Sequence, residues 1–378
     1  MNIAIDGRAA KWYRGTGIGT YTYQLINNIN QIDFLNSYTI FMPENITFDK
    51  KLRDNFTQIS VNQQSDSNFW EQVEIPNILT DDNINIYHVP QNGVGLSDNI
   101  NCKKIITLHD IIPLRMPETC SERYLNIFHE AIPKMIKNID GIITVSEFSK
   151  NDICKEFNYP KEKVFVTYLA AEDIYTPLNL HHCKNILNSK YSIDSDYILY
   201  VGGFSPRKNI LSLIDAFALL RSKYKKDIKL VIVGNKGISY PIYKKRADEL
   251  NLSSDIIFPG FIPMSDMPIF YNSAKLFAYP SSYEGFGLPP LEAMACGTPV
   301  IASTETSIPE ILQDNALLVN PMDTNSLAEG MLNILQDKSL ASNLITKGLV
   351  HASRFNWKKT AYDTLEAYNH IAYDTSNY

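Results

Sequence analysis

The chain has 378 residues, a formal net charge of −6 and an ordinary globular composition, with 44% hydrophobic and 20% charged residues. This length is sufficient for two domains with separate hydrophobic cores. Neither half of the chain has the excess of Lys and Arg that nucleic-acid binding needs, so a nucleic-acid partner is not expected. No apolar run is long enough to span a membrane.

The cysteine pattern argues against disulfides and zinc. Five cysteines are scattered along the chain, and none of them forms a Cys-x-x-Cys pair. No Asp-x-Asp motif follows a predicted strand, so no metal ligands are predicted. The first residues, Met1–Asp6, turn polar at once and give no secretion signal. We therefore expect a cytoplasmic protein with free thiols.

The first half of the chain alternates short apolar runs with helical patterns, which predicts a parallel sheet covered by helices. In such sheets ligands bind at the carboxyl ends of the strands. Strands are expected near residues 2–6, 38–42, 85–89, 104–108, 141–145 and 164–167, and helices near 20–29, 69–79, 121–137 and 146–157.

Two features at strand ends are candidates for ligand contact. Gly15, Gly17 and Gly19 form a loop that lets a ligand come close to the backbone, although their spacing is not that of a dinucleotide fingerprint. His109 directly follows the strand 104–108 and precedes Asp110. The alternatives are a permissive loop without a ligand and a histidine that only orients its own loop.

The second half begins after a polar stretch, residues 176–195, which we interpret as a linker. Strands are expected near 197–201, 230–234, 256–262, 275–280, 299–302 and 317–319, with helices near 210–224 and 357–372. Arg207 and Lys208 precede the first of these helices. Cations at a helix N-terminus are unfavourable unless an anion lies between, so the pair indicates a bound diphosphate; the alternative is a solvated basic turn.

The segment 281–297 has the pattern of a turn followed by a helix that begins near Pro289 and ends at Gly297. Gly285 and Gly287 allow backbone N–H groups to point outward as a phosphate site. Glu284 and Glu292 flank this turn, and carboxylates suit sugar hydroxyl groups. Together these features favour a nucleotide-sugar; the alternative is an ordinary turn with two solvent-facing glutamates.

The same segment resembles a known element. Glu284 and Glu292 stand eight residues apart, and the sequence around them is similar to the Glu-x7-Glu element of retaining GT-B glycosyltransferases of family 4. The run His109-Asp-Ile-Ile-Pro113 and the loop Gly202–Asn209 resemble further elements of this family. One departure is Gly203, where many members carry an additional arginine.

The resemblance implies a role for each candidate residue. Glu284 would meet the hydroxyl groups of the donor sugar, Glu292 the ribose, and Arg207 with Lys208 the diphosphate. His109 would approach the donor sugar near its C6 hydroxyl and reacting centre. The remaining donor-binding residues implied by the family are Gly15, Gly17, Gly19, Ile262, Gly285, Phe286, Gly287 and Leu288.

The implied architecture is α/β, with two facing Rossmann-like domains of the GT-B type. Residues 1–180 would form the acceptor-side domain and residues 190–355 the nucleotide-sugar domain. Residues 356–378 would form a helix that returns to the first domain.

The implied function is retaining, metal-independent transfer of a hexose without a cofactor, by front-face displacement. The motifs look most like the mannosyl- and rhamnosyl-type branch of bacterial O-antigen and capsule assembly. GDP-mannose is the first expectation for the donor, with UDP-hexoses close behind. The acceptor would be a glycan or a lipid-linked saccharide, with only peripheral contact at the cytoplasmic membrane face. The alternatives are a nucleotide-sugar epimerase, a phosphorylase, and a non-catalytic sugar-binding protein on the same fold.

Overall fold

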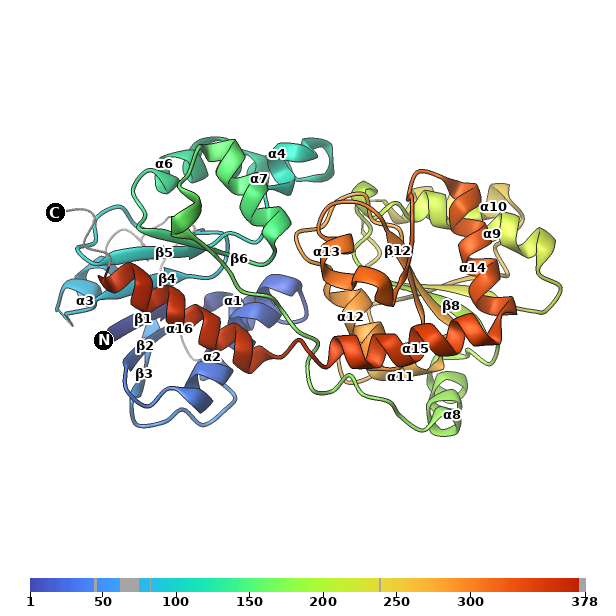
Figure 1. Cartoon of the computed structure of the whole chain (residues 1–378), viewed down its shortest axis with the longest axis horizontal. Coiled ribbons are helices and arrows are strands. Elements are labelled where there is room, and N and C mark those ends of the chain that lie inside the picture. Colours follow the sequence, from blue (N-terminus) through green and yellow to red (C-terminus); the bar gives the residue numbers. More distant parts are fainter. Residues whose placement is uncertain (44–45, 62–74, 82, 238, 374–378) are drawn as a thin grey trace. The chain divides into compact units, whose positions relative to one another are not determined.

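A computed structural model describes residues 1–43, 46–61, 75–81, 83–237 and 239–373. By its internal contacts the chain divides into two compact units. The first unit comprises Met1–Leu169 together with Asn356–Tyr378, and the second comprises Ala170–Phe355. Each unit is built on one parallel sheet with helices packed around it, which confirms the predicted α/β class (Figure 1).

The described part of the first unit contains a seven-stranded sheet in the order β3-β2-β1-β4-β5-β6-β7. Every strand pair in it is parallel. The central strands are buried on both faces, as their uninterrupted apolar runs require. The strands are β1 (Asn2–Asp6), β2 (Ser37–Pro43), β3 (Phe56–Val61), β4 (Ile86–Val89), β5 (Lys103–Thr107), β6 (Gly141–Thr144) and β7 (Val164–Val166).

The helices of the first unit include α16, which comes from the far end of the chain and packs against α2, β6 and β7 (Figure 1). The helices are α1 (Arg8–Trp12), α2 (Gly17–Ile32), α3 (Ile75–Asp81), α4 (Ile112–Arg115), α5 (Glu122–Asn126), α6 (Ile132–Ile136), α7 (Glu147–Phe157) and α16 (Trp357–Tyr373).

The described part of the second unit contains a six-stranded parallel sheet in the order β10-β9-β8-β11-β12-β13. The chain starts in the middle at β8, builds outward to β10, and then returns to the other side of β8. The strands are β8 (Tyr197–Val201), β9 (Lys229–Val233), β10 (Ile256–Gly260), β11 (Leu276–Tyr279), β12 (Val300–Ser303) and β13 (Leu317–Val319).

Helices of the second unit pack in pairs: α14 on α9, α10 on α9, α11 on α8 and α12 on α15. They are α8 (Leu180–Tyr191), α9 (Ile210–Lys223), α10 (Tyr240–Glu249), α11 (Met267–Ser273), α12 (Leu288–Ala295), α13 (Ile308–Leu312), α14 (Thr324–Gln336) and α15 (Lys338–Ala352).

The interpretation of residues 176–195 as a linker is wrong. This stretch contains α8, whose first turn is capped by the side chain of Asn179. Its two buried residues, Cys183 and Leu187, face the rest of the second unit. The polar residues that suggested a linker lie on the exposed side of a helix with a narrow apolar stripe.

Several other elements differ from the sequence-based expectation. The helix expected over 121–137 is interrupted by a π-helical turn, Ile127–Ala131, directly before Pro133. Strand β3 and helices α1, α8, α10, α11, α14 and α15 were not predicted. Part of the helix expected over 69–79 lies outside the described residues, and α3 covers the remainder.

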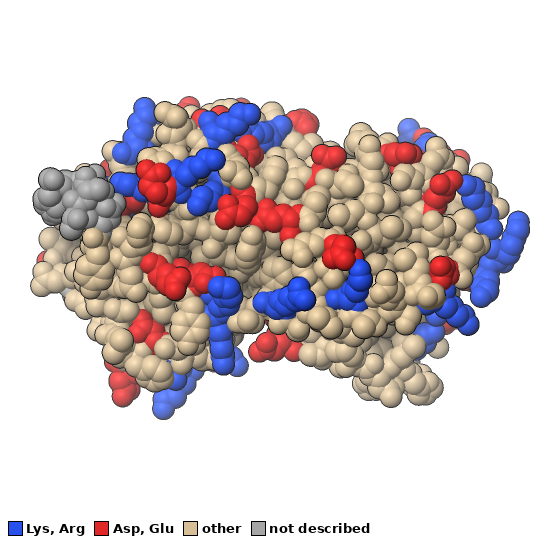
Figure 2. All heavy atoms as spheres, in the orientation of Figure 1, with Lys and Arg blue, Asp and Glu red and all other residues tan. Residues whose placement is uncertain are grey.

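Two surface properties agree with the composition. None of the described helices is both long and apolar enough to cross a membrane. On the face shown in Figure 2, Lys and Arg are interspersed with Asp and Glu over most of each unit.

Candidate active site

The candidate donor site lies at the carboxyl ends of β8 and β11, which are neighbours in the sheet of the second unit. The strand order changes direction between these two strands. In open α/β sheets the loops separate at such a point and leave a crevice, which is where ligands bind. Arg207 and Lys208 lie in the loop after β8, and Glu284 lies in the loop after β11.

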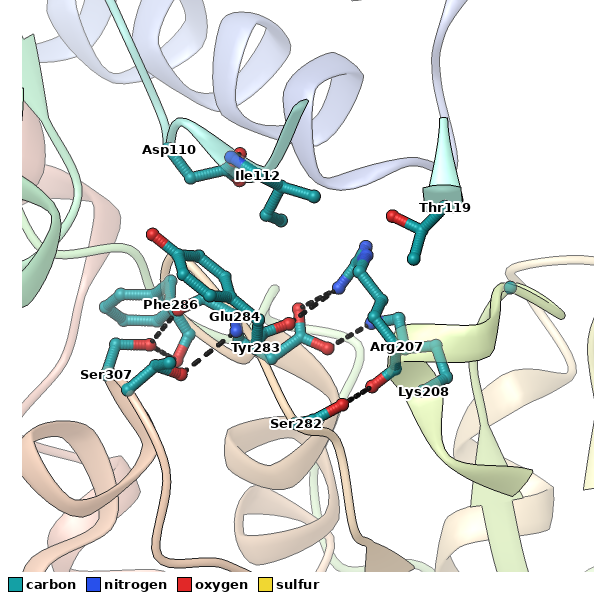
Figure 3. A network of polar contacts seen from close by, with 12 residues as sticks. Asp110, Ile112, Thr119, Arg207, Lys208, Ser282, Tyr283, Glu284, Phe286 and Ser307 are labelled. Carbon is teal, nitrogen blue, oxygen red and sulfur yellow. Dashed lines mark hydrogen bonds and ion pairs between the residues drawn. The ribbon is translucent and has the colours of Figure 1, made fainter. Parts of the chain in front are cut away.

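The three charged side chains form one ion-pair cluster. Lys208 Nζ lies 2.5 Å from Oε1 of Glu284, and Arg207 Nη1 lies 3.0 Å from Oε2. Figure 3 shows both cations directed at the carboxylate. The hydroxyl group of Tyr279 accepts a hydrogen bond from Lys208 Nζ at 2.7 Å and donates one to Oε1 of Glu284 at 3.0 Å. Lys208 and Glu284 are each only 7% exposed.

Further hydrogen bonds join the two loops. The backbone N–H and the hydroxyl of Ser282 both donate to the carbonyl oxygen of Arg207, at 2.8 and 2.9 Å (Figure 3). Arg207 Nη1 also donates to the carbonyl oxygen of Tyr283 at 2.9 Å. The cluster is therefore held by the backbones of two loops and not by flexible side chains alone.

The cluster fixes the charge of the carboxylate. Burial by itself would raise the pKa of Glu284, but the adjacent Arg207 and Lys208 more than offset this and hold the pKa at about 2. The cluster itself contains two cations and one anion. From the sequence we expected an anionic ligand to compensate Arg207 and Lys208; in this structure Glu284 is the anion beside them.

In the turn that precedes α12, the backbone N–H of Glu284 donates to Thr306 Oγ1 at 3.0 Å, and two further N–H groups point away from Ser307. Ser307 Oγ donates to the carbonyl oxygens of Glu284 and Phe286 at 2.8 and 3.1 Å (Figure 3). In a planar trans peptide the C=O and the following N–H point in opposite directions. The N–H groups of Gly285 and Gly287 therefore point away from Ser307.

The start of α12 depends on one glycine. Gly287, the N-cap, has φ of +102°, which disfavours any residue with a Cβ atom. Leu288 is the first helical residue and is followed by Pro289 and Pro290, which have no N–H. The N–H groups of this helix start are thus fewer than the sequence pattern alone suggested. Gly297 has φ of +77° and follows the helix end as predicted.

Glu292 lies on α12 and is partly exposed. Tyr271 donates a hydrogen bond to Oε2 of Glu292 at 2.7 Å. Burial raises the pKa of Glu292 to about 7, the hydrogen bonds from Tyr271 and Tyr175 oppose this rise, and the nearby charge of Glu172 adds to it. The two glutamates predicted from the sequence therefore differ in charge state, since Glu284 is ionised and Glu292 titrates near neutrality.

Gly203 lies in the loop after β8 and Ile262 in the loop after β10, in the same unit. Ile262 follows β10 and is buried, whereas its neighbour Phe261 is 68% exposed. A Cβ atom at Gly203 would meet nothing within 4 Å. The position where relatives carry an arginine is therefore open in this chain.

His109 lies in the first unit, two residues beyond β5. Its Nε2 is 3.0 Å from the carbonyl oxygen of Pro90, so Nε2 carries the proton and Nδ1 is the acceptor. Its backbone N–H donates to Asn92 Oδ1 at 2.9 Å. Burial lowers the pKa of His109 to about 4, and the bond to Pro90 only partly opposes this. The imidazole is therefore neutral near pH 7 and can accept a hydrogen bond from a hydroxyl group.

A buried series of hydrogen-bonded side chains begins at Tyr21, which packs against His109. The ring of Tyr21 packs edge-on against His109, with centroids 4.9 Å apart. The hydroxyl of Tyr21 is 3.0 Å from Thr107 Oγ1, which is 2.8 Å from His88 Nε2. His88 Nδ1 in turn is 2.7 Å from the hydroxyl of Tyr368 on α16. These hydrogen-bonded residues could not be predicted from the sequence, because they lie far apart along it.

The three loop glycines predicted as donor-binding residues, Gly15, Gly17 and Gly19, have different structural roles. Gly15 has φ of +91°. A Cβ atom at Gly19 would lie 1.9 Å from the carbonyl oxygen of Tyr13, and the Gly19 N–H is taken by Thr16 Oγ1 at 3.2 Å. At Gly17 a Cβ atom would meet nothing within 4 Å. Of these three, Gly17, the first residue of α2, is therefore the one at which neither the backbone dihedrals nor a neighbouring atom of the described structure requires glycine.

Among the described residues no group of three or more His, Cys, Asp or Glu side chains could hold a metal ion. The charged cluster of the second unit is built from two cations and one carboxylate, which is not a donor set for Mg²⁺.

Comparison with known proteins identifies the family. The model of the group 1 glycosyl transferases matches residues 187–374, and the model of glycosyltransferase family 4 matches residues 16–171. The O-antigen chain mannosyltransferase B of Escherichia coli is 33% identical over 266 residues, 70% of each chain. The serotype-specific mannosyltransferase WbdA of Escherichia coli is 29% identical over 291 residues, which is 73% of this chain and 34% of that protein.

The fold also matches solved structures. The Anabaena protein HepE, in complex with UDP and glucose, superposes with a TM-score of 0.76 at 18% identity and covers 98% of this chain and 99% of that one. The whole chain therefore has the GT-B architecture of two Rossmann-like units that the motifs implied. The chain belongs to the group 1 glycosyltransferases of family 4, and it is a glycosyltransferase.

Proposed function

We propose that this glycosyltransferase moves a mannosyl group from GDP-mannose to a saccharide acceptor during synthesis of a surface polysaccharide, with retention of configuration and without a metal ion. The choice of mannose is supported by the relatives named as O-antigen chain mannosyltransferase B and mannosyltransferase WbdA. The other parts of the proposal are argued from the site.

The single observation that carries the proposal is the ion-pair cluster at the switch point of the second unit. In this cluster Lys208 and Arg207 share the carboxylate of Glu284 beside the turn before α12. A leaving nucleoside diphosphate develops negative charge as the glycosidic bond breaks. Fixed cations in a partly buried site stabilise that charge without reorganisation, which is the role that a metal ion takes elsewhere.

Glu284 would then bind the donor sugar. Its carboxylate accepts hydrogen bonds from Lys208 and Tyr279 at Oε1 and pairs with Arg207 at Oε2. A carboxylate offers about four acceptor positions, so it can also accept a hydrogen bond from a hydroxyl of the donor sugar. Because its pKa is about 2, the group is ionised throughout the physiological range and is an acceptor only.

The chemical step is a front-face displacement. The bond between the anomeric carbon and the donor phosphate oxygen breaks, the acceptor oxygen bonds to the same face, and the acceptor proton passes to the departing phosphate oxygen. His109 is neutral and presents Nδ1 as an acceptor, so its proposed role is to bind a hydroxyl of the sugar and not to protonate the leaving group.

A second donor class is favoured by one comparison. The solved structure of HepE contains UDP and glucose, so a UDP-hexose is the alternative to GDP-mannose. The backbone at Ile262 and the exposed ring of Phe261 would meet the base in either case.

A donor screen tests the proposal. The purified chain would be incubated with GDP-mannose, UDP-glucose, UDP-galactose or dTDP-rhamnose and a lipid-linked saccharide acceptor, with and without EDTA. We expect transfer from GDP-mannose that EDTA does not abolish, and an α-linked product by NMR of the anomeric proton. Transfer from a UDP-sugar alone would replace the donor assignment, and loss of transfer in EDTA that Mg²⁺ restores would contradict the metal-free mechanism.

A further inference from the structure

Three contacts within the first unit hold His109. Its Nε2 donates to the carbonyl oxygen of Pro90 at 3.0 Å, and its backbone N–H donates to Asn92 Oδ1 at 2.9 Å. The ring of Tyr21 packs edge to face against the imidazole, with centroids 4.9 Å apart. The first two contacts come from the loop after β4, whereas Tyr21 lies on α2. The orientation of the imidazole therefore depends on how the ring of Tyr21 is held.

The ring of Tyr21 is held through its hydroxyl group. This hydroxyl lies 3.0 Å from Thr107 Oγ1, which lies 2.8 Å from His88 Nε2. His88 Nδ1 lies 2.7 Å from the hydroxyl of Tyr368 on α16. All four residues are 0% exposed, so bulk water does not replace a lost partner. Three hydrogen bonds thus join α2, β5, β4 and α16 into one buried series.

The bonds of this series depend on one another. Burial, with a further effect of His109, lowers the pKa of His88 to about 3, so its imidazole is neutral and carries one proton. If Tyr368 donates to Nδ1, that proton lies on Nε2 and is donated to Thr107. Without the Tyr368 hydroxyl, Nδ1 loses its partner in the series, and the bond to Thr107 no longer has a preferred direction. A change on α16 is therefore felt at the other end of the series.

Helix α16 does not need this series in order to pack. It lies against α2, β6 and β7 (Figure 1), and its buried residues include Trp357, Ala361, Ala367 and Ile371. Apolar contacts of this kind supply most of the free energy that docks an amphipathic helix. A fully paired polar series in such an interface adds a single fixed orientation, which apolar side chains do not impose.

We propose that Tyr368 on α16 is a positioning residue for His109, and that it acts through the hydrogen-bonded series that ends at Tyr21. The inference rests on the proposed function, in which His109 binds a hydroxyl group of the donor sugar. It adds that the series keeps the imidazole in the orientation at which Nδ1 accepts this hydrogen bond. Helix α16 therefore contributes to sugar transfer as well as to packing.

The experiment follows the ring nitrogens of His109 by 15N NMR in the full chain, with His109→Ala to assign the signals. In Tyr368→Phe we expect the His109 ring signals to shift or broaden while the protein stays folded. Transfer from GDP-mannose, or from a UDP-hexose if that is the donor, should fall about tenfold in kcat/KM, as for a small misplacement of a substrate contact. The affinity for GDP should not change, because GDP lacks the sugar.

A double-mutant cycle tests whether the two ends of the series act together. Tyr21→Phe removes the hydroxyl at the other end and keeps the ring on His109, and it also serves as the test if Tyr368→Phe does not fold. Because both substitutions break the same series, the double variant should lose no more activity than either single variant. Independent effects would multiply to a loss of about 100-fold and would overturn the inference.

Thr360→Val is the matched control on the same helix. It removes another buried hydrogen bond of α16, from Thr360 Oγ1 to the carbonyl oxygen of Tyr168 at 2.6 Å, which lies outside the series. This variant should keep the wild-type His109 signals and activity. Unchanged His109 signals in folded Tyr368→Phe, or an equal change in Thr360→Val, would overturn the inference.

The same measurements separate failure of the inference from failure of the proposed function. If His109→Ala transferred sugar as the wild type does, the proposed role of His109 would be rejected, and the inference with it. If the wild type used no nucleotide-sugar, the proposed function would fail, and the ring signals alone would decide whether Tyr368 positions His109.

Discussion

The two units have the same sheet plan but different charged groups at their carboxyl edges. Both sheets start at a central strand, build outward, and return to the other side of that strand. At the switch point of the second unit lie two cations that share one carboxylate. In the first unit the corresponding place, next to β1 and β4, holds the buried pair Asp6–Arg8, with Gln91 donating to Asp6 at 2.6 Å. The nearby His109 is neutral.

This difference shows how one fold can serve two roles. In the first unit Arg8 donates several hydrogen bonds to Asp6 and one to the carbonyl oxygen of Val94. In the second unit the cluster has one more cation than anion and adjoins a turn with outward N–H groups. Under the proposed function, the second unit would bind the diphosphate and the first unit would contact neutral hydroxyl groups.

The largest expected effect comes from the charged cluster. Glu284→Gln leaves Arg207 and Lys208 without their anion, and breaking a buried ion pair costs about 3–5 kcal/mol in unfolding free energy. Transfer activity should also fall by at least about 100-fold, as for loss of a preorganised electrostatic group. Chemical denaturation and initial rates measure the two effects.

Lys347→Ala is the control in the same unit, since Lys347 pairs with the exposed Asp314. It should leave the free energy of unfolding nearly unchanged, because exposed ion pairs contribute little to stability. Equal effects of the two substitutions would mean that the cluster is an ordinary surface pair.

Acidification should affect the stability of the two units differently. Burial, together with the charge of His109, lowers the pKa of His88 to about 3, and burial lowers that of His109 to about 4. Both are held neutral in the folded unit, so the unfolded chain binds more protons below pH 6.5. Their contribution to stability is complete above this pH and is lost as the pH falls, by roughly 3 kcal/mol per histidine at pH 4.

The second unit should respond in the opposite direction. The pKa of Glu292 is raised to about 7, so its contribution is complete below pH 4.5 and is lost as the pH rises through 7. Because the pKa of Glu284 is lowered to about 2, its contribution to the free energy of unfolding is complete above pH 4.5 and is lost as the pH falls toward 2. Hydrogen exchange, corrected for intrinsic rates, should show β5 and α16 losing protection between pH 6.5 and 4.5 while β11 and α12 keep theirs. If β11 and α12 lost protection over the same pH range as β5 and α16, the predicted difference between the units would be wrong.

A smaller effect distinguishes two glycines of the first unit. Gly19→Ala places a Cβ atom against the carbonyl oxygen of Tyr13 and should destabilise the protein by about 1–3 kcal/mol. Gly17→Ala enters open space and should leave stability unchanged or slightly higher. If the backbone at Gly17 approaches the substrate, this variant should nevertheless lose activity. Full activity of Gly17→Ala would remove Gly17 from the proposed site.

The smallest expected effect concerns Gly203. Gly203→Arg supplies the arginine that many relatives carry at a position with room for it, so stability should change by less than about 0.5 kcal/mol. A further cation near the diphosphate should tighten GDP binding by up to about tenfold. Gly202→Ala is the comparison, because its Cβ atom would lie 2.7 Å from the hydroxyl of Tyr200. Weaker GDP binding in Gly203→Arg would argue against a diphosphate at this loop.

Local patterns were sufficient to predict most strands and the position of the charged loops. Apolar runs that end at Gly202, Pro280 and His109 predicted β8, β11 and β5, since a buried strand must be apolar and the chain must turn at its end. The helix before β8 was mistaken for a linker, because the apolar stripe of Cys183 and Leu187 is narrow.

Contacts between distant residues could not be read from the sequence. Lys208 and Glu284 are 76 residues apart, and His88 and Tyr368 are 280 apart. Whether two cations meet a ligand or a carboxylate of their own unit depends on how the loops after β8 and β11 come together, which no single segment encodes. The interactions of Glu172 and Tyr175 with Glu292 likewise join residues that lie far apart in the sequence.

The central claim is that the charged edge of the second unit binds the nucleoside diphosphate. Calorimetry of GDP binding in EDTA, for the wild type, Lys208→Ala and His109→Ala, tests it most directly. We expect Lys208→Ala to weaken binding by about 30-fold, the loss of one charge-assisted contact, and His109→Ala to bind as the wild type does. Unchanged GDP affinity in folded Lys208→Ala, or a larger loss in His109→Ala, would contradict the account.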